Sequence, residues 1–307
     1  MQTGYITHPL CLKHDMGAHH PECPARIHAI EDQLIASGLF AYLQHHQAPE
    51  ATREQLSRVH APAYLDAIAA AAPQHGMVEL DADTSMNPFS YPAALRAAGA
   101  VVLGVDLVMA GKVENAFCNI RPPGHHAERA RAMGFCIFNN VAVAAAHALA
   151  AHGLSRVAIA DFDVHHGNGT EDIFHDDPRV MLCSTFQHPF YPYVGADSGN
   201  DHMINVPLAA GTGSEGFRDA VTNRWLPALE EFKPELLLIS AGFDAHREDD
   251  MAMLRLVDTD YTWVTERLKE IAYKHCQRRI VSTLEGGYEL HALGRCAMGH
   301  IKVLSGL

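Results

Sequence analysis

Hydrophobic and polar residues alternate along the chain with two different spacings. Short apolar runs rich in β-branched residues predict strands at 157–160, 180–183, 236–239 and 279–283, with a further strand-like run at 116–120. Between them, apolar residues recur at helical spacing and predict helices at 24–37, 91–110, 139–152, 214–232 and 260–275. Strands that alternate with helices predict an α/β fold built on a parallel sheet.

The length and composition fit a single domain. The chain has 307 residues, of which 48% are hydrophobic, so it can bury a large core. With 23 basic and 36 acidic residues the formal net charge is -13, which argues against a surface that neutralises nucleic-acid phosphates. We therefore predict one domain over residues 1–307 and no nucleic-acid partner.

Neither a secretory segment nor a membrane span is predicted. The first twelve residues lack a charged start followed by an apolar block. The most apolar stretch, 98–111, contains Asp106 and is shorter than the roughly 18 residues of a span, so it predicts a buried helix. The seven cysteines form no C-x-x-C pair, which favours reduced thiols over disulfides or a cysteine-built zinc site. We expect a cytoplasmic protein.

Metal-capable residues stand where two predicted strands end, the edge at which parallel sheets bind ligands. In extended backbone, Asp161, Asp163 and His165 share one face, and Asp244 closes a separate strand. An isolated aspartate is more often a helix cap or an ion-pair partner. Together, Asp163, His165 and Asp244 make a three-ligand metal site with an open position. Such ligands suit zinc, but also ferrous iron, cobalt or manganese.

Two further blocks carry polar groups suited to acyl transfer. In the run 121–126, two prolines and a glycine precede His125 and His126, which favours a rigidly held general base and an electrostatic partner. The run 285–288 ends in Tyr288, whose phenol can donate a hydrogen bond to an oxyanion. Because no G-x-S-x-G elbow is present, hydrolysis by metal-activated water is favoured over covalent catalysis.

Five ordered blocks resemble the histone deacetylase superfamily, closest to its class II and bacterial branch. They are Arg-Pro-Pro-Gly-His-His at 121–126, Gly-Phe-Cys at 134–136, the run 161–169, Gly-Phe-Asp-Ala-His at 242–246 and Glu-Gly-Gly-Tyr at 285–288. The resemblance spans nearly the whole chain. It implies an arginase-like fold with a central parallel sheet of about eight strands. It also implies a zinc-dependent amidohydrolase that deacetylates acetyl-lysine or a similar acylated amine.

The resemblance also implies a role for each matching residue. Asp163, His165 and Asp244 become the ligands of one zinc ion, and Tyr288 polarises the acyl carbonyl together with that ion. His126 becomes the general base and acid. His125 becomes its electrostatic partner, paired with Asp161. Some relatives carry an aspartate where this chain has Asn168, which leaves the basicity of His126 an open question.

Substrate and potassium sites follow from the same resemblance. Phe135 and Tyr191 resemble the aromatic walls of an acyl-lysine tunnel, with the Gly134 carbonyl offered to the substrate and Met251 near the entrance. A structural potassium ion is implied beside four residues: Asp161, Asp163, His165 and Ser184. A second monovalent site is implied near Phe174 and Val180.

Three alternative functions stay open. An acetylpolyamine amidohydrolase would carry an acidic residue at the position where this chain has Met251, and three acidic residues lie just before it, Glu248, Asp249 and Asp250. A non-catalytic acyl-lysine or metal-binding module would keep the pocket without the chemistry. A two-metal, arginase-like hydrolase would need further ligands, for which His166 and Asp161 are available. The sequence does not indicate the oligomeric state.

Overall fold

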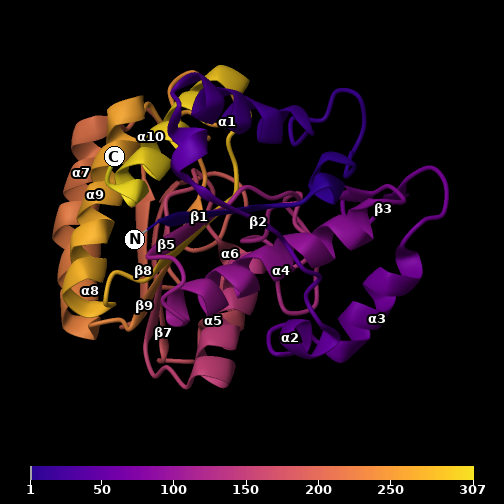
Figure 1. The fold of residues 1–307 in the computed structure, drawn as a ribbon, viewed down its shortest axis with the longest axis horizontal. Coiled ribbons are helices and arrows are strands. Elements are labelled where there is room, and N and C mark those ends of the chain that lie inside the picture. Colours follow the sequence, from indigo (N-terminus) through magenta and orange to yellow (C-terminus); the bar gives the residue numbers. More distant parts are fainter. Residues whose placement is uncertain (1) are drawn as a thin grey trace.

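Eight parallel strands form the central sheet of the computed structural model, which describes residues 2–307 (Figure 1). Their order across the sheet is β2-β1-β5-β10-β9-β6-β7-β8. The strands are β1 (Thr3–Thr7), β2 (Gln44–Gln47), β5 (Asn115–Cys118), β6 (Val157–Asp161), β7 (Val180–Gln187), β8 (Met203–Leu208), β9 (Leu236–Ala241) and β10 (Ile280–Leu284). The predicted α/β fold with about eight parallel strands is thereby confirmed. Met1, where the predicted domain begins, lies outside the described residues.

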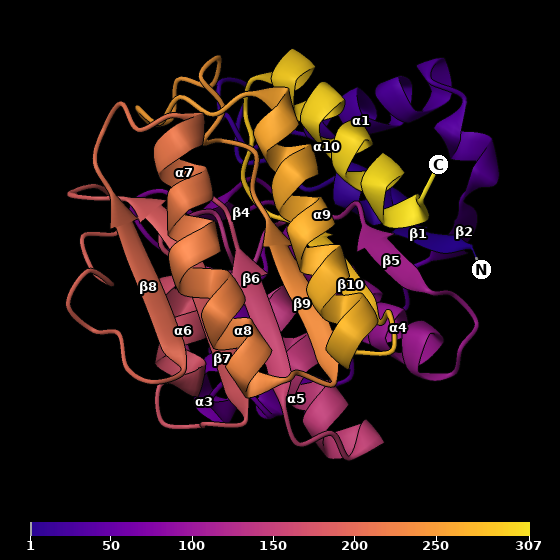
Figure 2. The same ribbon diagram turned by 90° about the vertical axis from the view of Figure 1, so that its left-hand side faces the viewer.

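Helices cover both faces of the sheet (Figures 1 and 2). On one face lie α4 (Ser90–Met109) and α5 (Asn140–His152), and on the other lie α1 (Ala25–Ala36), α7 (Ser214–Ala220), α8 (Leu226–Phe232), α9 (Asp258–His275) and α10 (Leu290–Ser305). Shorter helices are α2 (Arg53–Ser57), α3 (Pro62–Ala71) and α6 (Asn168–Phe174), and β3 (Val78–Glu79) pairs with β4 (Ser85–Met86) in a small hairpin. The layers are therefore helix, sheet and helix.

Strand β9 shows why the strands read as continuous apolar runs. Leu236 and Leu238 belong to the core under α4 and α5, whereas Leu237 and Ile239 belong to the core under α7 to α10. Successive side chains of a strand point to opposite faces, and both faces here are covered by helices. The strand is therefore apolar from Leu236 to Ile239 without alternation, and the buried Ser240 that follows has its hydroxyl hydrogen-bonded to Glu285.

Helix α4 is a core helix. Among the described residues it is the one helix long and apolar enough to cross a membrane, judged by length and composition. However, 61% of its apolar window is buried inside the fold, where it packs against β1, β10 and α5. The prediction that the apolar stretch around Asp106 forms a buried helix is confirmed.

The predicted helix 214–232 begins at Ser214 and ends at Phe232 as predicted, but it contains a π turn at Val221–Trp225. Pro227, two residues after that turn, has no backbone N–H to continue the helical hydrogen bonds. Strand β8 was not predicted, and it contains Pro207. Because β8 lies at the edge of the sheet, a proline is tolerated there.

A buried ion-pair network joins the N-terminal region to two loops at the carboxyl edge of the sheet. Glu22, Arg26 and Arg121 are all fully buried. The Glu22 carboxylate accepts hydrogen bonds from Arg26 Nη1 at 3.1 Å and from Arg121 Nη2 at 2.7 Å. Arg26 also donates to the Gly287 carbonyl at 2.7 Å and to the Glu285 carbonyl. Burial alone would raise the pKa of Glu22, but the guanidinium of Arg121 holds it well below its usual range.

We predict that Glu22→Gln lowers the free energy of unfolding by about 3–5 kcal/mol, because two buried guanidinium groups lose their counter-charge. Glu50→Gln is the matched control, since its partner Arg96 lies 3.1 Å away near the surface, and it should cost about 1 kcal/mol or less. Urea unfolding at neutral pH measures both, and equal losses would contradict the assignment.

The stability difference between wild type and Glu22→Gln should also depend on pH, and the pKa of Glu22 gives the direction of that dependence. The folded pKa of Glu22 is below its unfolded value, which is about 4.3 for a glutamate. Its stabilisation is therefore complete above that pH and is lost as the pH falls towards the folded pKa. The stability difference between wild type and Glu22→Gln should shrink in acid.

Candidate active site

Four neighbouring strands bring the predicted site residues together. In the order β5, β10, β9 and β6, these strands end beside one another. The tandem histidines follow β5, Tyr288 follows β10, Asp244 follows β9, and the run beginning at Asp161 follows β6. Residues more than a hundred positions apart in the sequence therefore share one edge, as expected for a parallel sheet.

Asp163, His165 and Asp244 form a buried cluster with the geometry of a metal site. His165 Nδ1 lies 3.1 Å from Asp163 Oδ1 and 3.2 Å from Asp244 Oδ2. One ligand atom from each residue lies within 4.8 Å of the others. The carboxylates are held by backbone N–H groups, from Gly286 to Asp163 Oδ2 at 2.8 Å and from Val164 to Asp244 Oδ1 at 2.9 Å.

The surroundings of this cluster fit a divalent cation. Asp244 Oδ2 is buried without a hydrogen-bond partner. A Cβ atom at Gly242 would collide with Asp163 Oδ2, and one at Gly286 would collide with Asp244 Oδ2, so backbone closely encloses the oxygens. Burial and the charge of Asp163 raise the pKa of Asp244 to about 7. One imidazole and two carboxylates are a ligand set that zinc accepts.

The tandem histidines are held in different electrostatic environments. His125 Nδ1 lies 2.9 Å from Asp161 Oδ2. Burial disfavours its charged form, but Asp161 and Asp163 outweigh this and raise the pKa of His125 well above its usual value. Burial, together with the charges of His125 and His165, lowers the pKa of His126 well below its usual value. The pair therefore favours a charged His125 beside a neutral His126.

Asn168 sets the tautomer of His126. The Asn168 amide nitrogen donates to Glu128 Oε1 at 2.8 Å, so the amide oxygen faces His126 Nδ1 at 2.7 Å. An amide oxygen only accepts hydrogen bonds, and Nδ1 must therefore carry the proton. The other ring nitrogen, Nε2, keeps its lone pair. The contact with Asn168 therefore assigns the tautomer of His126, whereas burial and the neighbouring histidines lower its pKa, and the role of His126 as a base stays a prediction.

A cavity of about 190 Å³ leads to the cluster. Its lining includes the expected Gly134, Phe135, Tyr191, Met251 and Tyr288, together with His126 and His165. It also includes Asp83 and Phe190, which the sequence did not single out. Phe190 stacks on His165 with ring centroids 5.8 Å apart, so it forms a wall beside Tyr191.

Phe135 adopts a strained backbone conformation at the cavity. Its φ is +68°, in the left-handed region that residues with a side chain rarely adopt. Its ring packs edge-on against Tyr288, with ring centroids 5.8 Å apart. Such conformations persist where the surrounding structure requires them, often at functional sites. Here the strain aims the aromatic ring into the cavity.

The acidic residues beside Met251 do not line the cavity. Glu248 pairs with Arg295 at 2.9 Å, and Asp249 accepts the backbone N–H groups of Tyr288 and Glu289 at 2.6 and 2.9 Å. Asp83 is the carboxylate among the lining residues, and it accepts the Gly134 N–H at 3.0 Å. The cavity therefore has an apolar wall at Met251 and one acidic group at Asp83.

Residues expected around potassium lie beside Asp161. Asp161 and Ser184 are paired across β6 and β7, and the buried Ser184 Oγ has no hydrogen-bond partner. Phe174 ends α6 and Val180 begins β7. His166 does not belong to the metal-capable cluster of Asp163, His165 and Asp244, and its Nε2 lies 2.7 Å from Glu171 Oε2. Its place outside that cluster counts against the two-metal alternative.

Glu285 is a site residue that sequence reasoning did not assign a role. Its Oε2 accepts the backbone N–H groups of Gly124 and His125 at 2.7 and 3.1 Å, and Ser240 Oγ donates to Oε1 at 3.2 Å. Burial raises the pKa of Glu285 to about 7. This side chain joins the ends of β5, β9 and β10. The signal that could have indicated this role was its position at a strand end beside two glycines.

Comparisons with known proteins agree with this geometry. A family model described as "Histone deacetylase domain" matches residues 20–304. The histone deacetylase-like amidohydrolase of Pseudomonas aeruginosa is 36% identical over 330 residues, which cover 100% of this chain and 87% of that protein. The polyamine deacetylase HDAC10 of Homo sapiens is 36% identical over 308 residues, which cover 93% of this chain and 45% of that protein.

A solved structure gives the same answer at the level of the fold. The HDA15 HD domain superposes with a TM-score of 0.92 at 35% identity, covering 99% of this chain and 88% of that one. Fold, strand-end residues and sequence thus all lead to one group of deacetylases and amidohydrolases. The chain belongs to the histone deacetylase family.

Proposed function

We propose that the protein is a zinc-dependent deacylase that hydrolyses the amide of acetyl-lysine or a similar acylated amine. The observation that carries this proposal is the buried cluster of Asp163, His165 and Asp244 at the base of an aromatic cavity. These three residues would hold the metal. When bound, zinc supplies a Lewis acid that activates water and polarises the acyl carbonyl.

In this proposal the tandem histidines transfer protons and stabilise charge. His126 presents an unprotonated Nε2, since its Nδ1 proton is held by Asn168. It accepts a proton from the attacking water and later returns it to the departing amine. His125, charged and paired with Asp161, stabilises the negative charge that develops beside it.

Tyr288 acts on the acyl oxygen. Burial raises the pKa of its phenol well above the usual value, so the group stays protonated and can donate a hydrogen bond. Arg26 lies 4.9 Å from the ring centroid and Phe135 packs against the ring edge, so the phenol is held in place. A positioned donor of this kind stabilises an oxyanion in the transition state.

The cavity favours a linear acylated amine with an apolar stem. Phe135, Phe190 and Tyr191 supply aromatic walls for such a stem. Met251 has no charge with which to attract a second ammonium group, and we therefore place acyl-lysine substrates before polyamines. Acetylpolyamine hydrolysis remains the second candidate, because Asp83 lies in the lining and one relative is named a polyamine deacetylase.

Four further expectations stay with this proposal. A structural potassium ion beside Asp161, Asp163, His165 and Ser184 is supported by the buried, unpartnered Ser184 Oγ. The expected second monovalent site near Phe174 and Val180, the Gly134 carbonyl as a substrate acceptor and the cytoplasmic location remain predictions.

Acetate release from a panel of substrates tests the function. We expect turnover of an acetyl-lysine peptide above that of N-acetylputrescine and N-acetylspermidine. Tyr288→Phe should keep its metal and lose about 10² to 10³ in rate, because one oxyanion donor is removed. Tyr64→Phe is the control, since that buried phenol donates to the Ile137 carbonyl outside the cavity.

Each result of the panel has a defined meaning. Faster turnover of the acetylpolyamines would establish the second candidate on the same site. No turnover of any substrate by metal-loaded protein would favour the non-catalytic binding module instead. An unchanged rate in Tyr288→Phe would remove Tyr288 from the mechanism.

We predict that Asp244→Asn abolishes tight metal binding. The substitution keeps the side-chain volume but replaces one carboxylate ligand and its charge. Asp250→Asn is the matched control, because Asp250 is exposed and does not line the cavity. Metal content after dialysis measures both variants, and full zinc retention in Asp244→Asn would contradict the ligand assignment.

We predict that Glu285 acts as a positioning residue through the tandem-histidine loop. Glu285→Ala should lose about 10²-fold in kcat with zinc retained, because displacing catalytic groups by about 1 Å has that effect. Glu285→Gln should stay close to wild type, since its amide oxygen can accept the same two N–H groups. A uniform loss in both variants, or metal loss in Glu285→Ala, would contradict a positioning role.

A further inference from the structure

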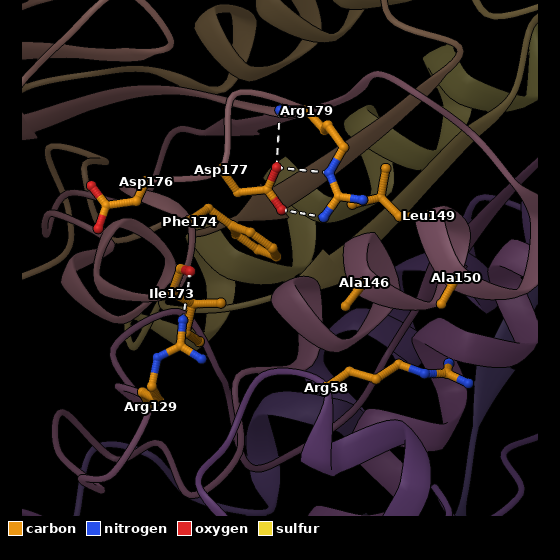
Figure 3. A pocket seen from close by; sticks show the side chains of 10 residues that line it. All are labelled: Arg58, Arg129, Ala146, Leu149, Ala150, Ile173, Phe174, Asp176, Asp177 and Arg179. Carbon is orange, nitrogen blue, oxygen red and sulfur yellow. Dashed lines mark hydrogen bonds and ion pairs between the residues drawn. The ribbon is translucent and has the colours of Figure 1, made fainter.

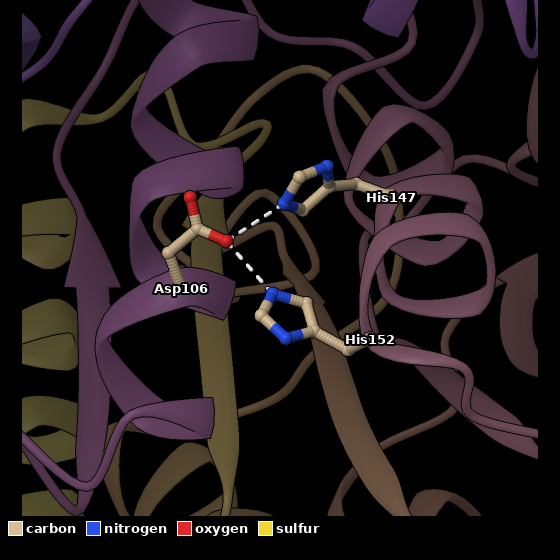
Figure 4. A group of neighbouring side chains, drawn as sticks. All are labelled: Asp106, His147 and His152. Carbon is tan, nitrogen blue, oxygen red and sulfur yellow. Dashed lines mark hydrogen bonds and ion pairs between the residues drawn. The ribbon is translucent and has the colours of Figure 1, made fainter.

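A second cluster of metal-capable side chains lies between α4 and α5, away from the active site (Figure 4). It consists of Asp106 from α4 with His147 and His152 from α5. His147 Nε2 and His152 Nε2 lie 2.7 and 2.8 Å from the same oxygen, Asp106 Oδ1. Both imidazoles therefore already point at one position.

This cluster lies at the amino edge of the sheet. His152 ends α5 just before β6 begins, and Asp106 lies in the last turn of α4 just before β5 begins. The active site lies beyond the carboxyl ends of the same strands. A ligand bound at this cluster would therefore be separate from the zinc proposed above.

The two imidazoles of this cluster are largely buried, whereas the carboxylate can be reached from solvent. The side chain of His147 is 8% exposed, that of His152 24% and that of Asp106 48%. Hydrogen bonds from both imidazoles outweigh the effect of burial and lower the pKa of Asp106, so its carboxylate is charged at neutral pH. Ligands of a tetrahedral zinc ion lie about 3.3 Å apart. To reach that spacing, Asp106 Oδ1 would have to move only about half an ångström away from the two Nε2 atoms.

One contact competes with metal binding. Arg58 Nη1 lies 3.1 Å from His147 Nδ1, and a guanidinium can only donate. In this arrangement His147 Nδ1 carries the lone pair and Nε2 carries the proton. A metal at Nε2 requires the opposite tautomer, so Arg58 must move away before His147 can become a ligand.

The structure provides space for that movement. Arg58 lines a cavity of about 400 Å³ beside α5 (Figure 3). The other arginines there are already engaged, Arg179 by Asp177 at 2.6 Å and Arg129 by the Ile173 carbonyl at 2.9 Å. Arg58 also pairs with the exposed Glu54 at 2.9 Å, and that partner can follow it.

A third candidate cluster lacks this freedom. His246, Asp258 and Cys296 also lie close together, but Arg295 Nε is 3.4 Å from Asp258 Oδ1. The guanidinium of Arg295 therefore already places a positive charge beside the Asp258 carboxylate. Arg295 is also held by Glu248, with which it forms an ion pair. The α4–α5 cluster is therefore the stronger candidate.

We propose that Asp106, His147 and His152 form a second divalent metal site, suited to zinc or a similar transition metal, that opens when Arg58 moves away. The ion would join α4 to α5 at the amino edge of the sheet. Two imidazoles and one carboxylate leave a coordination position for water. Because the ion binds only the folded chain, it would stabilise the fold.

Zinc titration of the protein that already contains its resident metal tests this site. Isothermal titration calorimetry should show one further saturable equivalent of Zn²⁺, and thermal unfolding should shift upwards on its addition. His152→Gln and Asp106→Asn should weaken this step by at least about 100-fold, because loss of a supporting partner alone costs 10–100-fold. His45→Gln is the control, since His45 is an exposed histidine that contacts the Phe40 carbonyl.

Arg58→Gln separates this proposal from general binding to surface histidines. Removing the competing hydrogen bond and its charge should tighten the second step by roughly tenfold. Acyl hydrolysis should be unaffected by His152→Gln, and Asp244→Asn should keep the second site while it loses the first. Unchanged Zn²⁺ binding in His152→Gln, or weaker binding in Arg58→Gln, would overturn the proposal.

Discussion

The arrangement of this protein depends on buried carboxylates that are held by backbone N–H groups. Asp163 and Asp244 accept N–H groups from loops that follow other strands, so each carboxylate also fixes the position of a neighbouring loop. A buried charge is costly unless it is paired or hydrogen-bonded. The loops must therefore close around these residues together, and the active site forms as part of the fold.

Buried ion pairs behind the metal-capable cluster also hold the neighbouring loops in position. Glu22 joins Arg121, at the start of the tandem-histidine loop, to Arg26, which holds the carbonyl groups of the loop that carries Tyr288. Glu285 joins the same two loops from the side of the sheet. His126 and Tyr288, the proposed base and oxyanion donor, thus share two supports, and their relative placement follows from ion pairs and hydrogen bonds behind the cavity.

The sequence could predict features that depend on neighbouring residues, but it could not predict contacts that form when distant segments pack together. The strand-end runs that hold Asp163, His165 and Asp244 are readable because period-two geometry and strand position are local properties. Strand β8 was not predicted, and it contains Pro207, which is unfavourable in a strand unless that strand lies at an edge, a position that only the topology reveals. Asp83 and Phe190 were missed as lining residues because loop packing brings them to the cavity. Of the two arginine partners of Glu22, Arg121 lies 99 positions away in the sequence.

Gly242 and Gly286 give the site a property that its charged residues do not reveal. At both positions the space of a single methyl group is already taken by a carboxylate oxygen of the proposed metal cluster. The pocket for the ion is thus shaped as much by missing side chains as by those present. In evolutionary terms, a substitution at one of the three cluster residues changes a single donor of the proposed metal site, whereas one added carbon at either glycine displaces the carboxylates themselves.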